Sequence, residues 1–389
     1  MLRTHFFFLF FALCTVCIAG DLQQLPGAEP IVVGKGKARQ DYSRRLRLAD
    51  LDELHTRVIY HKSGLVPPHA QGVVILIPGT SGNILSEYSL KSSMSPLANQ
   101  LAKRQLAPLA FQPPIYWKAD QGEVERAPFL QQYGTLAGNM NWLNKVIDFV
   151  IARMPLDENG NPTLPLYLIG RSTGAALGMQ SVHQYLLGDT HYDKLRFFKG
   201  FLFTGVSGHT ESAIETWHQN ERRFYFDENP LKGDKPVILA APEIFRQMQW
   251  QTHAVETHDV VNGSGAPRIF ATLGARDEFV YTSFEALADP IMDFALNHPQ
   301  ALTTLMFHDG HHDPSREIKD ASGVKRVESM ERMKAMLDTL LGNEDSAETN
   351  ARGAQILFMP HQNEVQNAIH ERASGNLIWN ACLDKFRRL

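Results

Sequence analysis

The sequence LYLIGRSTGAA occupies Leu166–Ala176 of this 389-residue chain. An apolar run leads into a Gly-x-Ser-x-Gly turn, and helix-forming residues follow, which is the pattern of a nucleophile elbow. The two glycines allow a sharp turn from strand to helix, so that Ser172 is held strained and exposed at the tip. The pattern therefore predicts a nucleophile at Ser172. The alternative is a serine at an ordinary helix N-cap that follows a turn glycine.

Short β-type runs alternate with longer helical stretches on both sides of this turn. Such alternation is typical of an α/β fold, in which a mostly parallel sheet is flanked by helices. Besides the strand that leads into Ser172, the patterns predict strands at 57–61, 72–77, 198–206, 267–274 and 301–307. They predict helices at 94–104, 141–153, directly after Ser172, at 284–296 and at 327–341.

Residues 1–20 have the pattern of a secretory signal peptide. A basic start at Arg3 precedes an apolar run at 6–19, and small residues follow at Ala19 and Gly20. This run of 14 positions is shorter than the about 20 residues of a membrane-spanning helix. We predict an exported protein, secreted or periplasmic, with cleavage near Gly20 and no stable membrane span. Cys382 is then the single cysteine of the mature chain, so no intrachain disulfide is expected.

The charge balance argues against a nucleic-acid partner. The chain has 38 Lys and Arg residues against 42 Asp and Glu residues, and its net charge is −4. No cluster of Lys and Arg residues is larger than a short pair, so the sequence predicts no positive electrostatic potential that would attract nucleic-acid phosphates. A small-molecule or lipid ester is the expected partner.

Two segments fall outside the alternating pattern. Residues 207–266 hold many aromatic and Met side chains between two predicted strands, which is typical of a lid or cap rather than a linker. The alternative is that these side chains form only a small core of their own. Residues 343–389 form an extension without a recognisable motif, in which 354–359 is a possible strand.

A nucleophilic serine requires a base to take its proton and an acid to orient that base. Asp277 and His311 each follow a predicted strand, and function gathers at the carboxyl ends of parallel strands. The chain order Ser, Asp, His is the order of α/β-hydrolases. Glu211 is the alternative acid, and His308 and His312 are the alternative bases.

On Gly170–Gly174, Gly274–Asp277 and Gly310-His311, the chain resembles the α/β-hydrolase superfamily, with its serine esterases and lipases, over about residues 55–342. The resemblance implies one hydrolase domain at 21–342 with the insert 207–266 as its lid. It implies Ser172 as the nucleophile, Asp277 as the acid and His311 as the base. It also implies an oxyanion hole whose first donor is the Thr173 N–H.

The second oxyanion donor is expected in the loop PGTSG at 78–82, where many relatives have His-Gly. Thr80 is our prediction, and Ser81 and Gly82 are the alternatives. Glycines on both sides of Thr80 suit a backbone that approaches a substrate carbonyl closely.

The histidine-rich segment 308–313 raises the possibility of a metal site. Its spacing does not match a helical His-x-x-x-His pair, and no second ligand group is evident, so we predict neither a metal nor another cofactor. The expected function is an exported serine hydrolase that cleaves carboxylic esters through an acyl-enzyme. The alternatives are a serine peptidase, a thioesterase or an acyltransferase, or a binding protein on a hydrolase scaffold.

Overall fold

A computed structural model of the chain describes residues 24–31, 45–79, 84, 97–114, 132–133, 136–205, 268–274, 302–308, 328–341, 348–349, 355–359 and 365. The predicted signal peptide, the insert 207–266 and the helix at 284–296 lie outside the described residues. So do Thr80, Ser81, Gly82, Glu211, Asp277, His311, His312 and Cys382.

The described strands form one sheet in the order β1-β2-β3-β5-β4-β6-β7-β8-β9-β11-β10. Their bounds are β1 Glu29–Pro30, β2 Leu46–Leu51, β3 Thr56–His61, β4 Gly72–Ile77, β5 Leu106–Phe111, β6 Leu166–Arg171, β7 Phe198–Thr204, β8 Arg268–Gly274, β9 Leu302–His308, β10 Glu348–Thr349 and β11 Gln355–Met359.

The pairing is parallel from β5 through β4, β6, β7, β8 and β9 to β11. It is antiparallel among β1, β2, β3 and β5 and between β10 and β11. The predicted α/β class with a mostly parallel sheet is therefore confirmed. Together with the sharp turn after β6, this is the arrangement of the α/β-hydrolase fold that the sequence resembles.

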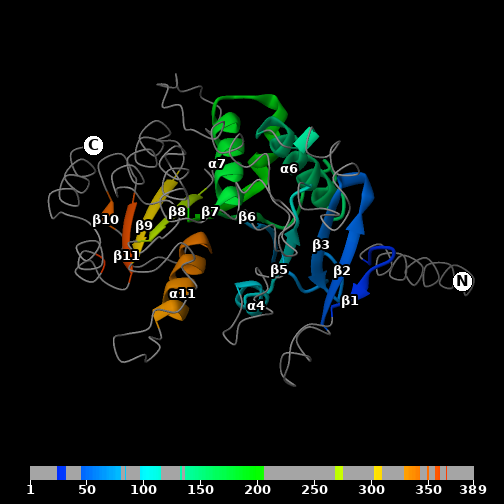
Figure 1. Ribbon diagram of the computed structural model, residues 1–389, viewed down its shortest axis with the longest axis horizontal. Coiled ribbons are helices and arrows are strands. Elements are labelled where there is room, and N and C mark those ends of the chain that lie inside the picture. The colour runs from blue at the N-terminus through cyan, green and yellow to red at the C-terminus, as the bar shows by residue number, and fades with distance from the viewer. Residues whose placement is uncertain are drawn as a thin grey trace, which may run out of the picture.

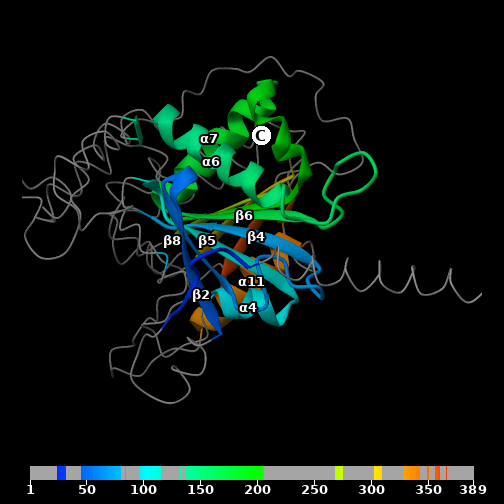
Figure 2. The same cartoon turned by 90° about the vertical axis from the view of Figure 1, so that its right-hand side faces the viewer.

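Helices cover both faces of the sheet, as the edge-on view shows (Figures 1 and 2). On one face lie α6 (Leu136–Ile151) and α7 (Thr173–Leu186), and on the other lie α4 (Leu97–Lys103) and α11 (Glu328–Leu341). The core is correspondingly split into two clusters of buried side chains. Val73 and Ile75 of β4 join the α6/α7 cluster, whereas Val74 and Leu76 join the α4/α11 cluster. Burial on both faces explains why this strand is a continuous apolar run.

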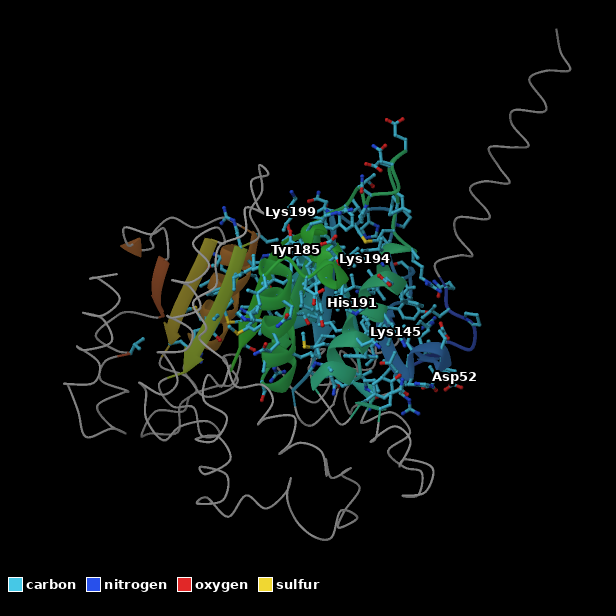
Figure 3. All side chains as sticks on the ribbon, turned by 90° about the horizontal axis from the view of Figure 1, so that it is seen from above. Asp52, Lys145, Tyr185, His191, Lys194 and Lys199 are labelled. Carbon is cyan, nitrogen blue, oxygen red and sulfur yellow. The ribbon has the colours of Figure 1, made fainter. Side chains whose placement is uncertain are left out.

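The short 3-10 helix η3, Thr190–Phe197, is tied to the outer surface of α6. Lys194 of η3 forms an ion pair with Asp148 of α6. The side-chain amide of Asn144 in α6 donates a hydrogen bond to the His191 carbonyl at 3.3 Å. Figure 3 shows Lys194 and His191 on this outer side of the helical layer. Within the described residues, no helix is long and apolar enough to cross a membrane.

Strand β5 is missing from the prediction because Pro108 interrupts its pattern. Proline has no backbone N–H and is normally excluded from central strands. Here β5 pairs with β4 over residues 106–110, but its pairing with β3 is limited to Ala110 and Phe111. At Pro108 the ladder of β5 is the parallel one with β4, in which Pro108 lies opposite Val74, and the ladder with β3 begins two residues later, at Ala110.

The C-terminal extension contributes to the same sheet. β11 pairs in parallel with β9, with Ile356 opposite Leu305 and Met359 opposite His308. β10 then adds an antiparallel edge strand, and Val365 is fully buried in the α6/α7 cluster. This part of the extension, for which the sequence suggested no role, completes the sheet.

A glycine in α7 sets how closely this helix packs on the sheet. A Cβ at Gly178 would lie 2.5 Å from Cε1 of Phe203 in β7, which is fully buried. Alanine is favoured over glycine in a helix by about 1 kcal/mol, but overpacking of a core costs about 1–3 kcal/mol. We expect Gly178→Ala to lower the free energy of unfolding, as measured by urea denaturation. In a Phe203→Leu background the same change should be neutral or stabilising, and a stabilising effect in the wild type would contradict this packing account.

Candidate active site

Ser172 stands alone between the last residue of β6, Arg171, and the first residue of α7, Thr173. Its backbone has φ 51° and ψ −116°, a region that costs a non-glycine residue about 1–3 kcal/mol. The Ser172 N–H donates to the Thr204 carbonyl of β7 at 2.8 Å, and its carbonyl accepts the Ala176 N–H at 3.0 Å. These bonds to a neighbouring strand and to the first helical turn hold the strained backbone in place.

The alternative interpretation, an ordinary N-cap serine, is wrong. An ordinary N-cap has extended backbone angles, and its side chain accepts a hydrogen bond from the first helical turn. Ser172 has a positive φ, and its side chain makes no capping hydrogen bond. The local geometry is that of a nucleophile elbow, while the catalytic role of Ser172 stays a prediction.

The two glycines of the motif are required for space. A Cβ at Gly170 would lie 2.5 Å from the carbonyl oxygen of Gly174 and 2.7 Å from Cα of Ala175. A Cβ at Gly174 would lie 2.5 Å and 2.6 Å from the carbonyl oxygens of Ile77 and Pro78. Contacts this short involve backbone atoms that cannot move aside easily. The start of α7 is therefore pressed against both its own strand and the carboxyl end of β4.

The strand register brings the carboxyl ends of β8 and β9 to the same edge of the sheet as Ser172. Arg171 lies opposite Thr204, Thr204 opposite Thr272, and Thr272 opposite Met306. β8 and β9 each continue two residues beyond this row, to Gly274 and His308, which lie opposite each other. Asp277 and His311 themselves lie outside the described residues, but each follows its strand by three residues.

His308 lies in the sheet rather than in the loop that follows it. It is the last residue of β9, with Gly274 on one side and Met359 on the other. Its side chain is 1% exposed, and the alternation of β9 places it on the face of Met306, which belongs to the α4/α11 cluster. A buried position on this face argues against His308 as the base for Ser172.

Sequence reasoning did not identify the part played by Thr204. Its carbonyl accepts the Ser172 N–H, and the next residue, Gly205, turns the chain with φ 61°. A backbone carbonyl carries no signature in the sequence, so only the β6–β7 pairing reveals this contact. Of the predicted oxyanion donors, Thr173 is the first residue of α7, where a backbone N–H has no intrahelical acceptor. No group of His, Cys, Asp or Glu residues suited to a metal occurs within the described part of the chain.

No protein-family model matches the chain, and no curated protein matches it. Among solved structures, an esterase from Pyrococcus furiosus is 14% identical with a TM-score of 0.42, covering 74% of this chain and 91% of that protein. A soluble variant of monoglyceride lipase from Saccharomyces cerevisiae is 12% identical with a TM-score of 0.44, covering 77% and 95%. Sequence identities and TM-scores this low do not indicate the activity of this chain.

The strand order and the turn at Ser172 identify the fold. The parallel strands β4, β6, β7, β8 and β9 are neighbours in that order. A strained serine follows the central strand β6, and helices cover both faces. The chain therefore has the α/β-hydrolase fold, with Ser172 in the sharp turn between β6 and α7.

Proposed function

We propose that the protein is a serine hydrolase that cleaves carboxylic esters through a covalent acyl-enzyme on Ser172. The observation that carries this proposal is the strained Ser172 backbone between β6 and α7. A cost of about 1–3 kcal/mol is maintained where the position serves a function rather than stability. The start of α7 adds N–H groups that have no helical acceptor and favour a developing negative charge.

In this proposal His311 takes the proton of Ser172 as its Oγ bonds to the ester carbonyl carbon. The N–H groups of Thr173 and Thr80 stabilise the resulting oxyanion. The C–O bond to the alcohol then breaks, and His311 returns the proton to the leaving oxygen. Water, activated by His311, releases the acid and restores Ser172, while Asp277 keeps the imidazole oriented.

The distances at the sheet edge support this assignment. Neighbouring strands are about 4.8 Å apart, so that β8 lies about 10 Å and β9 about 14 Å from β6. Three residues of chain span at most about 10 Å. Asp277 and His311 each follow their strands by three residues. That length of chain equals the separation of β8 from β6 and most of the separation of β9 from β6.

Two measurements test this function. A fluorophosphonate probe should label Ser172, identified by peptide mass, which a binding protein without a working nucleophile would not allow. A panel of p-nitrophenyl esters compared with aminoacyl amides then separates an esterase from a peptidase. If the probe labels Ser172 but no ester is hydrolysed, the esterase assignment is wrong, and a peptidase, thioesterase or acyltransferase is favoured instead.

We expect the rate to rise from acetyl to medium-chain acyl esters. The insert 207–266, proposed as a lid, supplies aromatic and Met side chains of the kind that line apolar pockets. Each well-buried CH₂ contributes up to about 0.8 kcal/mol until the pocket is full. A chain-length series of kcat/KM values measures this preference. If shortening the insert leaves the preference unchanged while labelling persists, the insert is not the acyl pocket.

A further inference from the structure

Gly79 follows β4 by two residues and lies directly against the elbow. A Cβ at Gly79 would lie 2.9 Å from Cβ of Ser172, 3.2 Å from the Arg171 carbonyl oxygen and 3.6 Å from Oγ of Ser172. The β4 end therefore forms one wall of the space around the hydroxyl.

Backbone conformation does not explain why residue 79 is glycine. Its φ is outside the left-handed region, in contrast to Gly64 and Gly205, whose φ values are 117° and 61°. The φ of residue 79 therefore does not require a glycine. What a side chain could not do is fit beside Ser172, because a Cβ–Cβ distance of 2.9 Å is shorter than real contacts.

We propose that Gly79 is a positioning residue for the nucleophile, whose missing side chain leaves free the space beside Oγ in which the ester carbonyl is held. This inference rests on the proposed function of Ser172. A reacting carbonyl carbon approaches the attacking oxygen to about 3–3.5 Å before the bond forms. A methyl group at residue 79 would stand 3.6 Å from the same oxygen, in the same shell around it.

The consequence is a specific effect on the chemical step. A methyl group at residue 79 displaces Ser172, the backbone of residue 79 or both. The position of the attacking oxygen depends on that arrangement. Displacing a reacting group by about 1 Å costs on the order of 100-fold in rate. The effect should appear in kcat, because it acts on the geometry of attack.

Gly72 offers a matched control at the other end of the same strand. A Cβ at Gly72 would lie 2.9 Å from Cδ2 of Leu106 and 3.1 Å from the Pro165 carbonyl oxygen. Each alanine variant meets a contact of 2.9 Å, at Gly72 with the end of the Leu106 side chain and at Gly79 with Cβ of Ser172. Gly79→Ala should lower kcat for p-nitrophenyl esters about 100-fold with little change in KM. Gly72→Ala should lose thermal stability, by no more than Gly79→Ala does, and keep kcat within about threefold.

A second experiment does not depend on ester turnover. Ser172→Gly removes the Cβ that residue 79 would meet, so Gly79→Ala should lower Tm less in that background than in the wild type. The double-mutant cycle measures this contact. If Gly79→Ala alone fails to fold, recovery of a folded protein in the Ser172→Gly background reports the same contact. Equal losses of Tm in both backgrounds would show that residue 79 does not press on Ser172, and would overturn the proposal.

The failure of the proposal and the failure of the proposed function have different signatures. If wild-type protein is not labelled by the fluorophosphonate probe, the serine hydrolase assignment fails. If wild-type protein is labelled and active, and Gly79→Ala matches Gly72→Ala in labelling rate and kcat, the role of Gly79 is wrong while the function stands. A slow labelling rate in Gly79→Ala, with normal labelling in Gly72→Ala, supports both.

Discussion

Ser172→Ala should reduce ester hydrolysis by about 10⁴-fold or more while leaving the fold intact. The change removes only the Oγ, and the strained backbone stays held by the Thr204 carbonyl and the Ala176 N–H. Because the side chain makes no capping hydrogen bond, its loss costs the helix nothing. Initial rates on a p-nitrophenyl ester, together with thermal unfolding, measure the two parts of this expectation.

Ser181 in the same helix provides the control. It is fully buried, and its hydroxyl donates to the Leu177 carbonyl at 3.1 Å, away from the elbow. Ser181→Ala should change stability by about 1 kcal/mol and leave both probe labelling and turnover unchanged. Ser172→Ala that kept more than about a tenth of the wild-type turnover would contradict the assignment of the nucleophile, since nucleophile loss costs far more.

The predictable part of the fold is the part in which a strand or helix carries its own signal. β4 was predicted because both of its faces are buried, which makes every position from Val73 to Ile77 apolar. The Gly-x-Ser-x-Gly turn was predicted because close packing at Gly170 and Gly174 excludes every larger residue. In both cases the residues that carry the signal lie close together in the sequence, although Gly174 packs against the distant Ile77 and Pro78.

The features that the sequence did not predict depend on contacts between segments that are far apart in the chain. Pro108 lies in β5 opposite Val74 of β4, and the ladder of β5 with β3 begins only at Ala110; nothing near Pro108 in the sequence indicates this pairing. The crowding between Gly79 and Ser172 brings together residues far apart in the chain. For the same reason, the chain order of Ser172, Asp277 and His311 predicts a triad but not how the three side chains approach one another.

Single substitutions of the histidines should separate a catalytic base from a structural residue. His311→Ala should lower kcat/KM by about 10⁴-fold or more, because Ser172 then lacks the group that accepts its proton. His308→Ala should instead lower the free energy of unfolding by about 1–3 kcal/mol, because His308 is buried in β9. Its kcat/KM should stay within about tenfold of the wild type, since its side chain is buried on the face of Met306. Rates and urea midpoints for both variants measure this contrast.

The location of His308 determines what each outcome means. His308 lies opposite Gly274 and Met359 in the ladder, so reaching Ser172 would require β9 to leave the sheet. His311, in contrast, follows the last residue of β9 by three residues. A larger catalytic loss in a stable His308→Ala protein than in His311→Ala would therefore require a different register for β9. His312→Ala completes the set of variants. If His312→Ala lowers kcat/KM as much as His311→Ala does, the rates do not assign the base to His311 alone.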